Sequence, residues 1–176
     1  MAISDLQVER YARHILLPEI GGAGQADVMR AKVLVVGAGG LGSPVVLYLA
    51  AAGVGTIGII DDDKVDLSNL QRQIAHTTAR IGLSKVESAR DSIKDINPDV
   101  MVNMHKERLT EENAIDLVGS YDLVADGSDN FKTRFIANDA CFLTGTTLVS
   151  AAILRFDGQL STYKAHLDDG QGQHPC

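Results

Sequence analysis

The side chains best suited to take part in chemistry are two cations and one acid. Arg72 and Lys85 are the cations, and Asp129 is the acid, in the run DGSDN at 126–130. Beside a nucleotide, two cations can neutralise the charge that builds on the phosphates, and an acid can hold Mg²⁺. The sequence has no Ser-His-Asp set, no nucleophile elbow and no Walker lysine motif. An attacking carboxylate is already ionised at neutral pH, so the lack of a general base is consistent with carboxylate adenylation.

A glycine-rich turn offers a place for the phosphates. Gly37, Gly39 and Gly42 fill the pattern G-x-G-x-x-G, and Gly40 makes the turn richer still. They follow a β-branched run at 32–36 that is typical of a buried parallel strand. The first glycine permits a tight turn, the second lets the backbone approach a phosphate, and the third lets a helix pack on the strand. This context favours a nucleotide site over a turn used only for packing.

The segments after the turn complete a nucleotide-binding unit. Residues 41–52 are apolar nearly all round, which predicts a central helix covered on most sides, with Gly53 as its C-cap. Residues 56–60 predict a second strand, and Asp61 stands at its carboxyl end, where a ribose would lie. The pattern does not choose between a dinucleotide and ATP. A redox dehydrogenase could use the glycines and Asp61, but it would leave the two cations and the second acid unexplained.

Lys85 is the first residue of a predicted helix, which is the wrong end for a cation because of the helix dipole. Ser84 and Glu87 form an S-x-x-E capping box, and the helix should end at Asn97-Pro98. Helix N–H groups and a lysine ammonium that point the same way would bind a phosphate. The buried stripe of this helix is expected to consist of Val86, Ala89, Ile93 and Ile96.

The remaining periodicity predicts a doubly wound sheet. Strands are expected at 100–105, 121–125 and 147–153, with helices at 110–118 and 131–143. In such a sheet the loop after the strand at 121–125 enters the same crevice as the glycine turn. This argument makes Asp129 the functional acid and Asn130 the cap of the next helix, while Asp126 is interpreted as structural. A short turn capped by Ser68 or Asn69 would carry Arg72 and Gln73 into the same crevice.

The two ends of the chain are interpreted as additions to this sheet. Residues 4–17 predict a helix that ends near Pro18, followed by a loop with glycines at 21, 22 and 24 and a short helix at 25–30. Asp157-Gly158 between apolar runs is a strong hairpin signal, so a strand at 159–163 should be antiparallel. The expected fold class is therefore α/β, a Rossmann-like doubly wound mostly parallel sheet with an antiparallel strand at the C-terminal end and an N-terminal helical appendage.

Composition excludes several classes of protein. The 176 residues are 45% hydrophobic with a formal net charge of -7, which argues against disorder, general nucleic-acid binding and an anionic membrane surface. Neither a signal peptide nor a membrane-spanning run is evident. Cys141 and Cys176 offer no disulfide framework, so we expect a cytoplasmic protein, with Cys141 as a small buried hydrophobe. The five histidines lack metal-ligand spacing.

Together these motifs resemble those of the ThiF/MoeB/HesA family, the bacterial relatives of ubiquitin-activating enzymes. The resemblance covers almost the whole chain at the right spacing, and it implies binding of ATP-Mg²⁺. It also implies adenylation of the C-terminal Gly-Gly carboxylate of a ubiquitin-like sulfur carrier protein, with release of pyrophosphate. The matching pieces are RYARHILLPEIG at 10–21, VLVVGAGGLGSP at 33–44, LAAAGVGTIGIIDDDKVDLSNLQRQ at 49–73, GLSKVESAR at 82–90, INP at 96–98, ADGSDNFKTRF at 125–135 and LVSAAILRFDGQL at 148–160.

The resemblance also implies a role for each site residue. Gly40 and its neighbours would hold the phosphates, Asp61 the ribose and Asp129 the Mg²⁺. Arg13 would reach as an arginine finger into the other subunit of a homodimer, although its spacing from Arg10 favours a solvated surface. The residues implied in catalysis are Arg13, Arg72, Lys85 and Asp129. The residues implied in nucleotide binding are Gly37, Gly39, Gly40, Gly42, Asp61, Asp63, Ser68, Asn69, Leu70, Gln71, Arg72, Gln73, Lys85, Asp129 and Asn130.

The chain departs from the family pattern at its end. Members usually continue with a crossover loop, further strands and often two C-x-x-C pairs that bind zinc. Cys176 resembles the first cysteine of such a pair, so we expect a truncated chain and zinc only in a longer one. The expected divisions are a helical appendage at 1–30, an ATP-binding adenylation domain at 31–163 and a polar tail at 164–176 that begins the crossover loop.

Two questions stay open at this point. The sequence does not identify the carrier, so the molybdopterin and thiamine pathways both remain, with a slight preference for molybdopterin. The alternatives to a sulfur carrier adenylyltransferase are an NAD-type Rossmann oxidoreductase and a non-catalytic ATP-binding homologue. Retention of Arg72, Lys85 and Asp129 together argues against the non-catalytic homologue.

Overall fold

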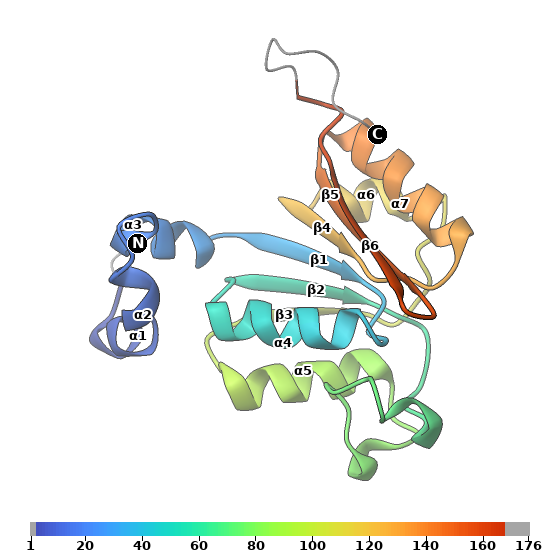
Figure 1. Cartoon of the computed structure of the whole chain (residues 1–176), viewed down its shortest axis with the longest axis horizontal. Helices are drawn as coiled ribbons and strands as arrows, with labels where there is room; N and C mark the ends of the chain where they lie inside the picture. The colour runs from blue at the N-terminus through green and yellow to red at the C-terminus, as the bar shows by residue number, and fades with distance from the viewer. Residues whose placement is uncertain (1–2, 168–176) are drawn as a thin grey trace.

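The computed structural model describes residues 3–167, and a single six-stranded sheet forms its centre (Figure 1). The strand order is β3-β2-β1-β4-β5-β6, in which the first five strands are parallel and β6 is antiparallel to β5. This is the Rossmann strand order, and it confirms the predicted fold class. The strands are β1 (Lys32–Val36), β2 (Thr56–Ile60), β3 (Met101–His105), β4 (Leu123–Asp126), β5 (Thr147–Leu154) and β6 (Asp157–Tyr163).

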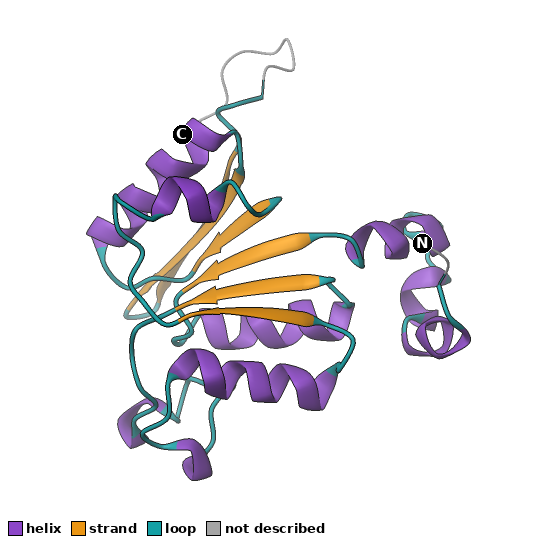
Figure 2. Cartoon of the chain, turned by 180° about the vertical axis from the view of Figure 1, so that it is seen from behind, coloured by secondary structure: helices purple, strands orange, loops and turns teal. Residues whose placement is uncertain are grey.

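Helices cover both faces of the sheet (Figure 2). On one face, α4 (Gly42–Ala52) and α5 (Lys85–Ile96) pack over Val33 and Val35. On the other face, α6 (Ala114–Val118) and α7 (Phe131–Thr144) pack over Leu34 and Val36. Successive side chains of a strand point to opposite faces, so the continuous apolar run of β1 supplies both cores.

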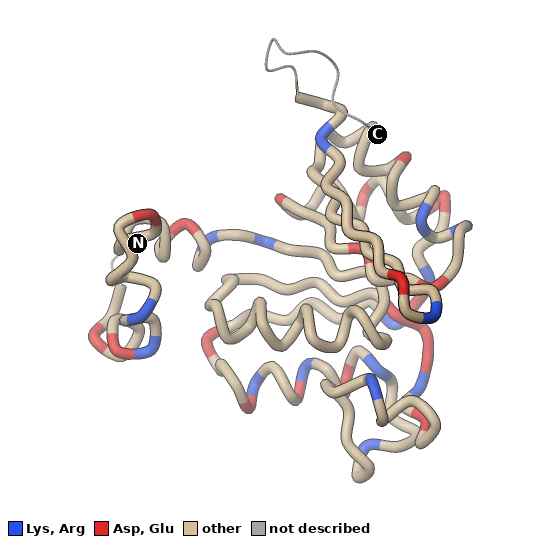
Figure 3. The backbone as a smooth tube through the Cα atoms, viewed as in Figure 1, with Lys and Arg blue, Asp and Glu red and all other residues tan. Residues whose placement is uncertain are grey.

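The two helices on the first face differ in charge and in burial. Figure 3 shows acidic and basic residues along α5 and none along α4. The prediction that α4 is covered on most sides is confirmed, because only Tyr48 and Ala51 of its eleven residues are exposed. In α5, Val86, Ala89 and Ile93 are buried as predicted, but Ile96 lies at the exposed end of the helix. Gly53 caps α4 in the left-handed conformation, as predicted.

The N-terminal segment folds into three short helices at the amino edge of the sheet (Figure 1). They are α1 (Asp5–Arg10), α2 (Ala12–Ile15) and α3 (Gly21–Val28). The predicted single helix at 4–17 breaks at Tyr11, whose side chain is buried and whose hydroxyl accepts a hydrogen bond from Asn97 at 2.7 Å. The predicted glycine loop is helical, because Gln25 of α3 is fully buried and donates to the carbonyl of Ala52 at 3.0 Å. These tertiary contacts outweigh the low helix propensity of glycine.

Several element boundaries differ from the predictions for local reasons. The helix expected from position 110 begins at Ala114, since the Asn113 side chain accepts a hydrogen bond from the Thr110 amide at 2.8 Å and closes a turn. The strand expected at 121–125 spans 123–126, and the strand expected at 100–105 begins at Met101. The hairpin turn is Arg155-Phe156 instead of Asp157-Gly158, because Leu154 pairs with Asp157 in the ladder. Arg155 takes the positive φ of 58° that this two-residue turn requires.

Two short 3₁₀ turns lie between β2 and α5, at Leu67–Asn69 and Thr78–Arg80. The first is capped by Asp66, which accepts from the Ser68 amide at 2.8 Å. The turn that carries Arg72 and Gln73 follows it, and the backbone carbonyl of Asn69 accepts from both of their amides, whereas the side chains of Ser68 and Asn69 do not form the predicted cap among residues 3–167. The capping box at Ser84 and Glu87 is also wrong, because the buried Ser84 hydroxyl finds no hydrogen-bond partner among residues 3–167. Within the same residues, no helix is long and apolar enough to cross a membrane.

Candidate active site

The glycine turn lies at the carboxyl edge of the sheet, between β1 and α4, as predicted. Gly37 has a φ of 87°, in the left-handed region that side chains rarely adopt. A Cβ atom on Gly42 would lie only 1.7 Å from the carbonyl oxygen of Gly37. The first helical residues follow Leu41, whose side chain has no acceptor with which to cap the helix. The Ser43 amide donates to the Gly39 carbonyl at 2.9 Å and Pro44 has no N–H group, so Gly42 is the residue of this first turn whose N–H, unpaired among residues 3–167, is open to an anion.

Both backbone groups of Ala38, inside the turn, are held by side chains. Its amide donates to Asp61 Oδ2 at 2.8 Å, and its carbonyl accepts from Ser43 Oγ at 3.2 Å and pairs with His76 Nε2 at 2.9 Å. Asp61 also accepts from the Asp63 amide at 2.8 Å. A carboxylate has about four lone-pair sites, so these two bonds leave Asp61 able to accept from a ribose hydroxyl. The sequence reasoning named Asp61 but did not single out Ser43 or His76.

Arg72 and Gln73 lie over the glycine turn. A Cβ atom on Gly40 would be 3.3 Å from Arg72 Cδ, and one on Gly39 would be 3.7 Å from Gln73 Nε2. Arg72 is exposed, and no ion pair of its guanidinium is found within residues 3–167. Gln73 is buried, and its Oε1 atom finds no partner in the described part of the chain. The turn is thus flanked by a free cation and an unsatisfied acceptor.

Lys85 occupies the start of α5 with its ammonium against an acid. Its Nζ lies 2.8 Å from Asp63 Oδ2, and its side chain is 6% exposed, whereas that of Asp63 is 61% exposed. The Lys85 amide also donates to the Asp63 carbonyl at 3.0 Å. Asp63 is therefore the anion that compensates this cation at a helix N-terminus. Through the bond from the Asp63 amide to Asp61, Lys85 is connected to the glycine turn.

The loop after β4 packs directly against the glycine turn, as the doubly wound topology predicts. A Cβ atom on Gly37 would lie 3.3 Å from the carbonyl oxygen of Gly127 and 3.5 Å from the amide of Ser128. Asp126 is buried and accepts from the Ser128 amide at 2.9 Å and from Ser150 Oγ at 2.8 Å. These contacts agree with a structural role for Asp126.

Arg134 of α7 is a part of this loop that the sequence reasoning missed. Its guanidinium donates to the carbonyls of Ser128 and Ala151, the latter at 2.8 Å, and to Ser150 Oγ at 3.2 Å. It also lies 3.5 Å from Asp126 Oδ2. In the sequence, the one signal for this role of Arg134 was its position one helical turn after Asn130, because its hydrogen-bond partners come from three different segments. Arg134 ties β5 to the loop that carries Asp129.

Asp129 and Asn130 are exposed at the carboxyl edge. Asn130 caps α7 as predicted, since its Oδ1 accepts from the Thr133 amide at 2.9 Å. In the described part of the chain, the Asp129 carboxylate accepts one hydrogen bond, from the Asn130 side-chain amide at 3.5 Å. An exposed carboxylate with so little engagement is a hard oxygen ligand of the kind that Mg²⁺ prefers. The residue therefore fits the metal that the sequence reasoning assigned to it.

Asp61, Asp62 and Asp63 also gather their carboxylates, with one oxygen of each within 4.8 Å of the others. Two of them are already paired, Asp63 with Lys85 and Asp62 with Arg108 Nε at 2.7 Å. The Arg108 guanidinium has a raised pKa, caused chiefly by this hydrogen bond to Asp62. Two of the three carboxylates are thus balanced by cations, and acids of this kind do not by themselves indicate a metal.

Other residues that were predicted to contact the nucleotide form hydrogen bonds within their own segment. Ser68 Oγ donates to Asp66 at 2.5 Å, and Gln71 Nε2 donates to the Ser68 carbonyl at 3.1 Å. Within residues 3–167, no hydrogen bond joins Ser68, Asn69 or Gln71 to the glycine turn. Leu70 lies in the same segment, just before Arg72. The roles assigned to these four residues remain predictions.

Arg13 lies far from this site within the chain. Its helix α2 belongs to the N-terminal segment at the amino edge, whereas the glycine turn is at the carboxyl edge (Figure 1). Arg13 is exposed, and no hydrogen bond or ion pair of its side chain is found in the part of the chain that the structure describes. One copy of the chain therefore does not bring Arg13 to its own glycine turn. Cys176, the predicted zinc ligand, lies outside the described residues.

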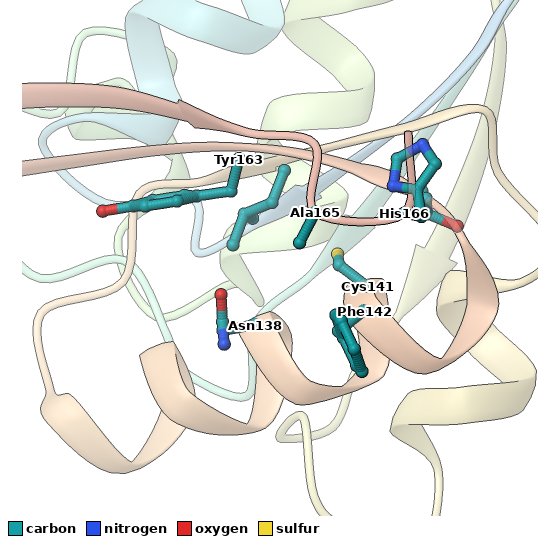
Figure 4. Close-up of a pocket in the computed structure, with 8 residues that line it drawn as sticks. Asn138, Cys141, Phe142, Tyr163, Ala165 and His166 are labelled. Carbon is teal, nitrogen blue, oxygen red and sulfur yellow. The ribbon is translucent and has the colours of Figure 1, made fainter. Parts of the chain in front are cut away.

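Cys141 lies away from the crevice, in a small pocket between α7 and the end of β6 (Figure 4). The pocket is also lined by Asn138, Phe142, Tyr163 and His166, and its cavity of about 10 Å³ would hold at most one water molecule. Burial raises the pKa of the Cys141 thiol to about 12. The thiol is therefore protonated at neutral pH and is a poor nucleophile, which confirms the interpretation of a buried core residue.

Curated relatives match nearly the whole chain. It is 54% identical to the probable adenylyltransferase/sulfurtransferase MoeZ of Mycobacterium tuberculosis, over 97% of this chain and 44% of that protein. It is 50% identical to the adenylyltransferase and sulfurtransferase MOCS3 of Culex quinquefasciatus, over 92% of this chain and 37% of that protein. It is 48% identical to the sulfur carrier protein adenylyltransferase of Thermus thermophilus, over 89% of this chain and 58% of that protein. The chain thus spans between 37% and 58% of the length of these relatives.

Solved structures of other proteins also match this chain. The tRNA N6-threonylcarbamoyladenosine dehydratase TcdA of E. coli, in complex with ATP, aligns with a TM-score of 0.80 and 30% identity, over 85% of this chain and 61% of that one. The same enzyme is also known in complex with AMP. The ThiF family model matches residues 11–176. With a family match over almost its full length and a Rossmann-type fold shared with an ATP-bound neighbour, this chain belongs to the ThiF family.

Proposed function

We propose that this chain uses ATP and Mg²⁺ to adenylate the C-terminal Gly-Gly carboxylate of a ubiquitin-like sulfur carrier protein. A carboxylate oxygen of the carrier attacks the α-phosphorus of ATP and forms the acyl-adenylate. The bond between the α-phosphorus and the bridging oxygen breaks, and pyrophosphate leaves with the electron pair. The attacking group is already ionised, so no side chain has to remove a proton.

The observation that carries the proposal is the position of two cations beside one glycine turn. Arg72 lies across Gly40, and the Lys85 ammonium is connected to the turn through Asp63 and Asp61. Negative charge moves onto the leaving pyrophosphate, and fixed cations stabilise it where it develops. A dinucleotide oxidoreductase has no use for this pair of cations. The names of the relatives, which are adenylyltransferases, support the same choice.

Asp129 supplies the ligand for Mg²⁺ in this proposal. When bound, the metal ion neutralises phosphate charge and orients the triphosphate. Asp61 binds the ribose while it keeps its bond to the Ala38 amide. Arg13 acts from the second subunit of a homodimer, because its own site lies at the opposite edge of the sheet. Zinc is not part of the proposal, since Cys176 lies outside the described residues.

Exchange of radiolabelled pyrophosphate into ATP tests the proposal. The complete protein that carries this sequence is mixed with carriers of the molybdopterin and thiamine types, and with each carrier after removal of its Gly-Gly. Exchange is expected only with an intact carrier, because the acyl-adenylate must form for pyrophosphate to add back. ATP binding without exchange for every carrier would instead support a non-catalytic homologue. Reduction of a nicotinamide cofactor in place of ATP binding would support the oxidoreductase alternative.

Replacing Arg72 or Lys85 with alanine is expected to weaken ATP binding. Each change removes a charged hydrogen bond, which costs about 1.5–3 kcal/mol, or roughly a 10- to 150-fold rise in Kd. Isothermal titration calorimetry with ATP-Mg²⁺ measures the effect, and melting temperatures show whether each variant folds. Lys94→Ala is the matched control, because Lys94 lies exposed in the last turn of the same helix as Lys85. Unchanged affinity in both variants would refute the roles assigned to these cations.

A further inference from the structure

His76 links the two elements that would bind phosphate. Its ring is only 5% exposed and lies between the glycine turn and α5. Its Nε2 is 2.9 Å from the carbonyl oxygen of Ala38, and its Nδ1 is 2.9 Å from Ser88 Oγ. Ser88 stands three residues after Lys85 on α5, and so on the same side of the helix. One imidazole therefore connects the turn to the helix face that carries Lys85.

The partners of the ring determine its protonation. A carbonyl oxygen can only accept, so Nε2 carries the hydrogen, and Nδ1 of the neutral ring accepts from the Ser88 hydroxyl. Burial lowers the pKa of His76, and the charges of Lys85 and Arg80 lower it further. The bond to Ala38 and the charge of Asp61 oppose this shift but do not outweigh it. The ring is therefore neutral at pH 7, with a single tautomer.

Ala38 needs such an anchor because of its neighbours. It stands between Gly37 and Gly39, and glycine loses more conformational freedom on ordering than any other residue. Asp61 holds the amide of Ala38, while His76 holds its carbonyl together with Ser43. With both groups held, the peptide planes on either side of Ala38 are fixed. Without His76, only the longer bond from Ser43 Oγ, at 3.2 Å, would hold the carbonyl of Ala38.

We propose that His76 is a positioning residue, which holds the glycine turn in its ATP-binding conformation and sets its distance from Lys85. This inference rests on the proposed function, because it takes the glycine turn to bind ATP.

Two substitutions separate positioning from simple packing. In His76→Gln, the side-chain amide can place an N–H near the position of Nε2, so the bond to Ala38 survives. In His76→Asn, the shorter amide reaches only the position of Nδ1, so the bond to Ser88 survives and the bond to Ala38 is lost. We expect ATP affinity within about threefold of the parent for His76→Gln and at least about tenfold weaker for His76→Asn, as measured by calorimetry. Equal losses in two variants of similar melting temperature would overturn the proposal.

A second pair of variants tests the link to α5. Ser88→Ala removes the hydroxyl that bonds to Nδ1 of His76 and so connects the ring to α5, and we expect a measurable rise in the Kd for ATP. Ser92→Ala is the matched control, because Ser92 lies one turn further along α5 and donates to the Ala75 carbonyl at 2.6 Å without touching His76. The Kd for ATP should not change in this control. An equal rise of the Kd in both serine variants would show that a general change in α5, and not the bond between Ser88 and His76, lowers the affinity for ATP.

Two measurements without ATP keep this inference separate from the proposed function. Imidazole ¹⁵N chemical shifts should show a neutral His76 with hydrogen on Nε2 at pH 7. Hydrogen–deuterium exchange of the peptide that covers Gly37–Gly42 should be faster in His76→Asn than in His76→Gln. If the parent protein failed to bind ATP, the proposed function would fall, while these two results would still decide whether His76 holds the turn. A charged ring, the opposite tautomer or equal exchange in the two variants would refute the anchor.

Discussion

Replacement of Asp129 by asparagine is expected to abolish adenylation of the carrier while the fold survives. Asparagine keeps the shape of the side chain but removes the charge that would hold Mg²⁺. The metal ion contributes several kcal/mol of charge stabilisation in the transition state, so the rate should fall by about 10²-fold or more. Pyrophosphate exchange with saturating ATP and carrier measures this loss. The melting temperature should not change, because Asp129 is exposed and, among residues 3–167, its carboxylate accepts one hydrogen bond, from the Asn130 side chain at 3.5 Å.

Two controls make this result interpretable. Asp139→Asn changes an exposed acid on the same helix, α7, away from the carboxyl edge, and should leave the exchange rate unchanged. Asp126→Asn should instead lower stability, because Asp126 is 2% exposed and accepts hydrogen bonds from Ser128 and Ser150. An Asp129→Asn variant that exchanges pyrophosphate at the parental rate would exclude Asp129 as the metal ligand.

Replacement of Arg13 by alanine is expected to lower turnover by about 10³-fold, the effect associated with arginine fingers. The side chain is exposed at the amino edge of the sheet, opposite the glycine turn of its own chain. In the proposed function, this effect comes from the second subunit of a dimer. Steady-state rates of adenylation measure the change. Arg10→Ala is the control, since Arg10 donates to the Ile96 carbonyl at 2.9 Å and should affect stability instead of turnover.

Mixed dimers test whether Arg13 acts between subunits. One subunit carries Asp129→Asn and the other carries Arg13→Ala, and neither homodimer is active. In the mixed dimer, the site that keeps Asp129 receives an intact Arg13 from its partner. Random pairing of equal amounts should restore about a quarter of the active sites. If subunit exchange is proven and no activity returns, Arg13 does not act in trans and is a surface residue.

Much of the fold could be predicted because its signals are local. The run at 32–36, the glycine turn and the strand at 56–60 are each specified by neighbouring residues, and β1 and β2 have the predicted bounds. Asn130 and Gly53 were identified as caps because capping depends on one residue and its immediate neighbours. Errors appeared where a distant contact outweighed a local preference. Tyr11 interrupts a helix because its hydroxyl binds Asn97, which lies 86 residues away in the chain.

In the candidate site, too, local features could be predicted from the sequence and long-range contacts could not. The sequence by itself determined which residues could be named as candidates, since the glycines, Arg72, Lys85 and Asp129 stand in short motifs with recognisable spacing, and their contacts with a nucleotide stay predictions. Only the tertiary structure decided how the glycine turn is held. Asp61 and His76 reach Ala38 from 23 and 38 residues away, and Arg134 bonds to Ser128 in the loop after β4 and to Ala151 within β5. Hydrogen bonds of this kind depend on the distances that packing creates between elements. No periodicity within one segment reports those distances.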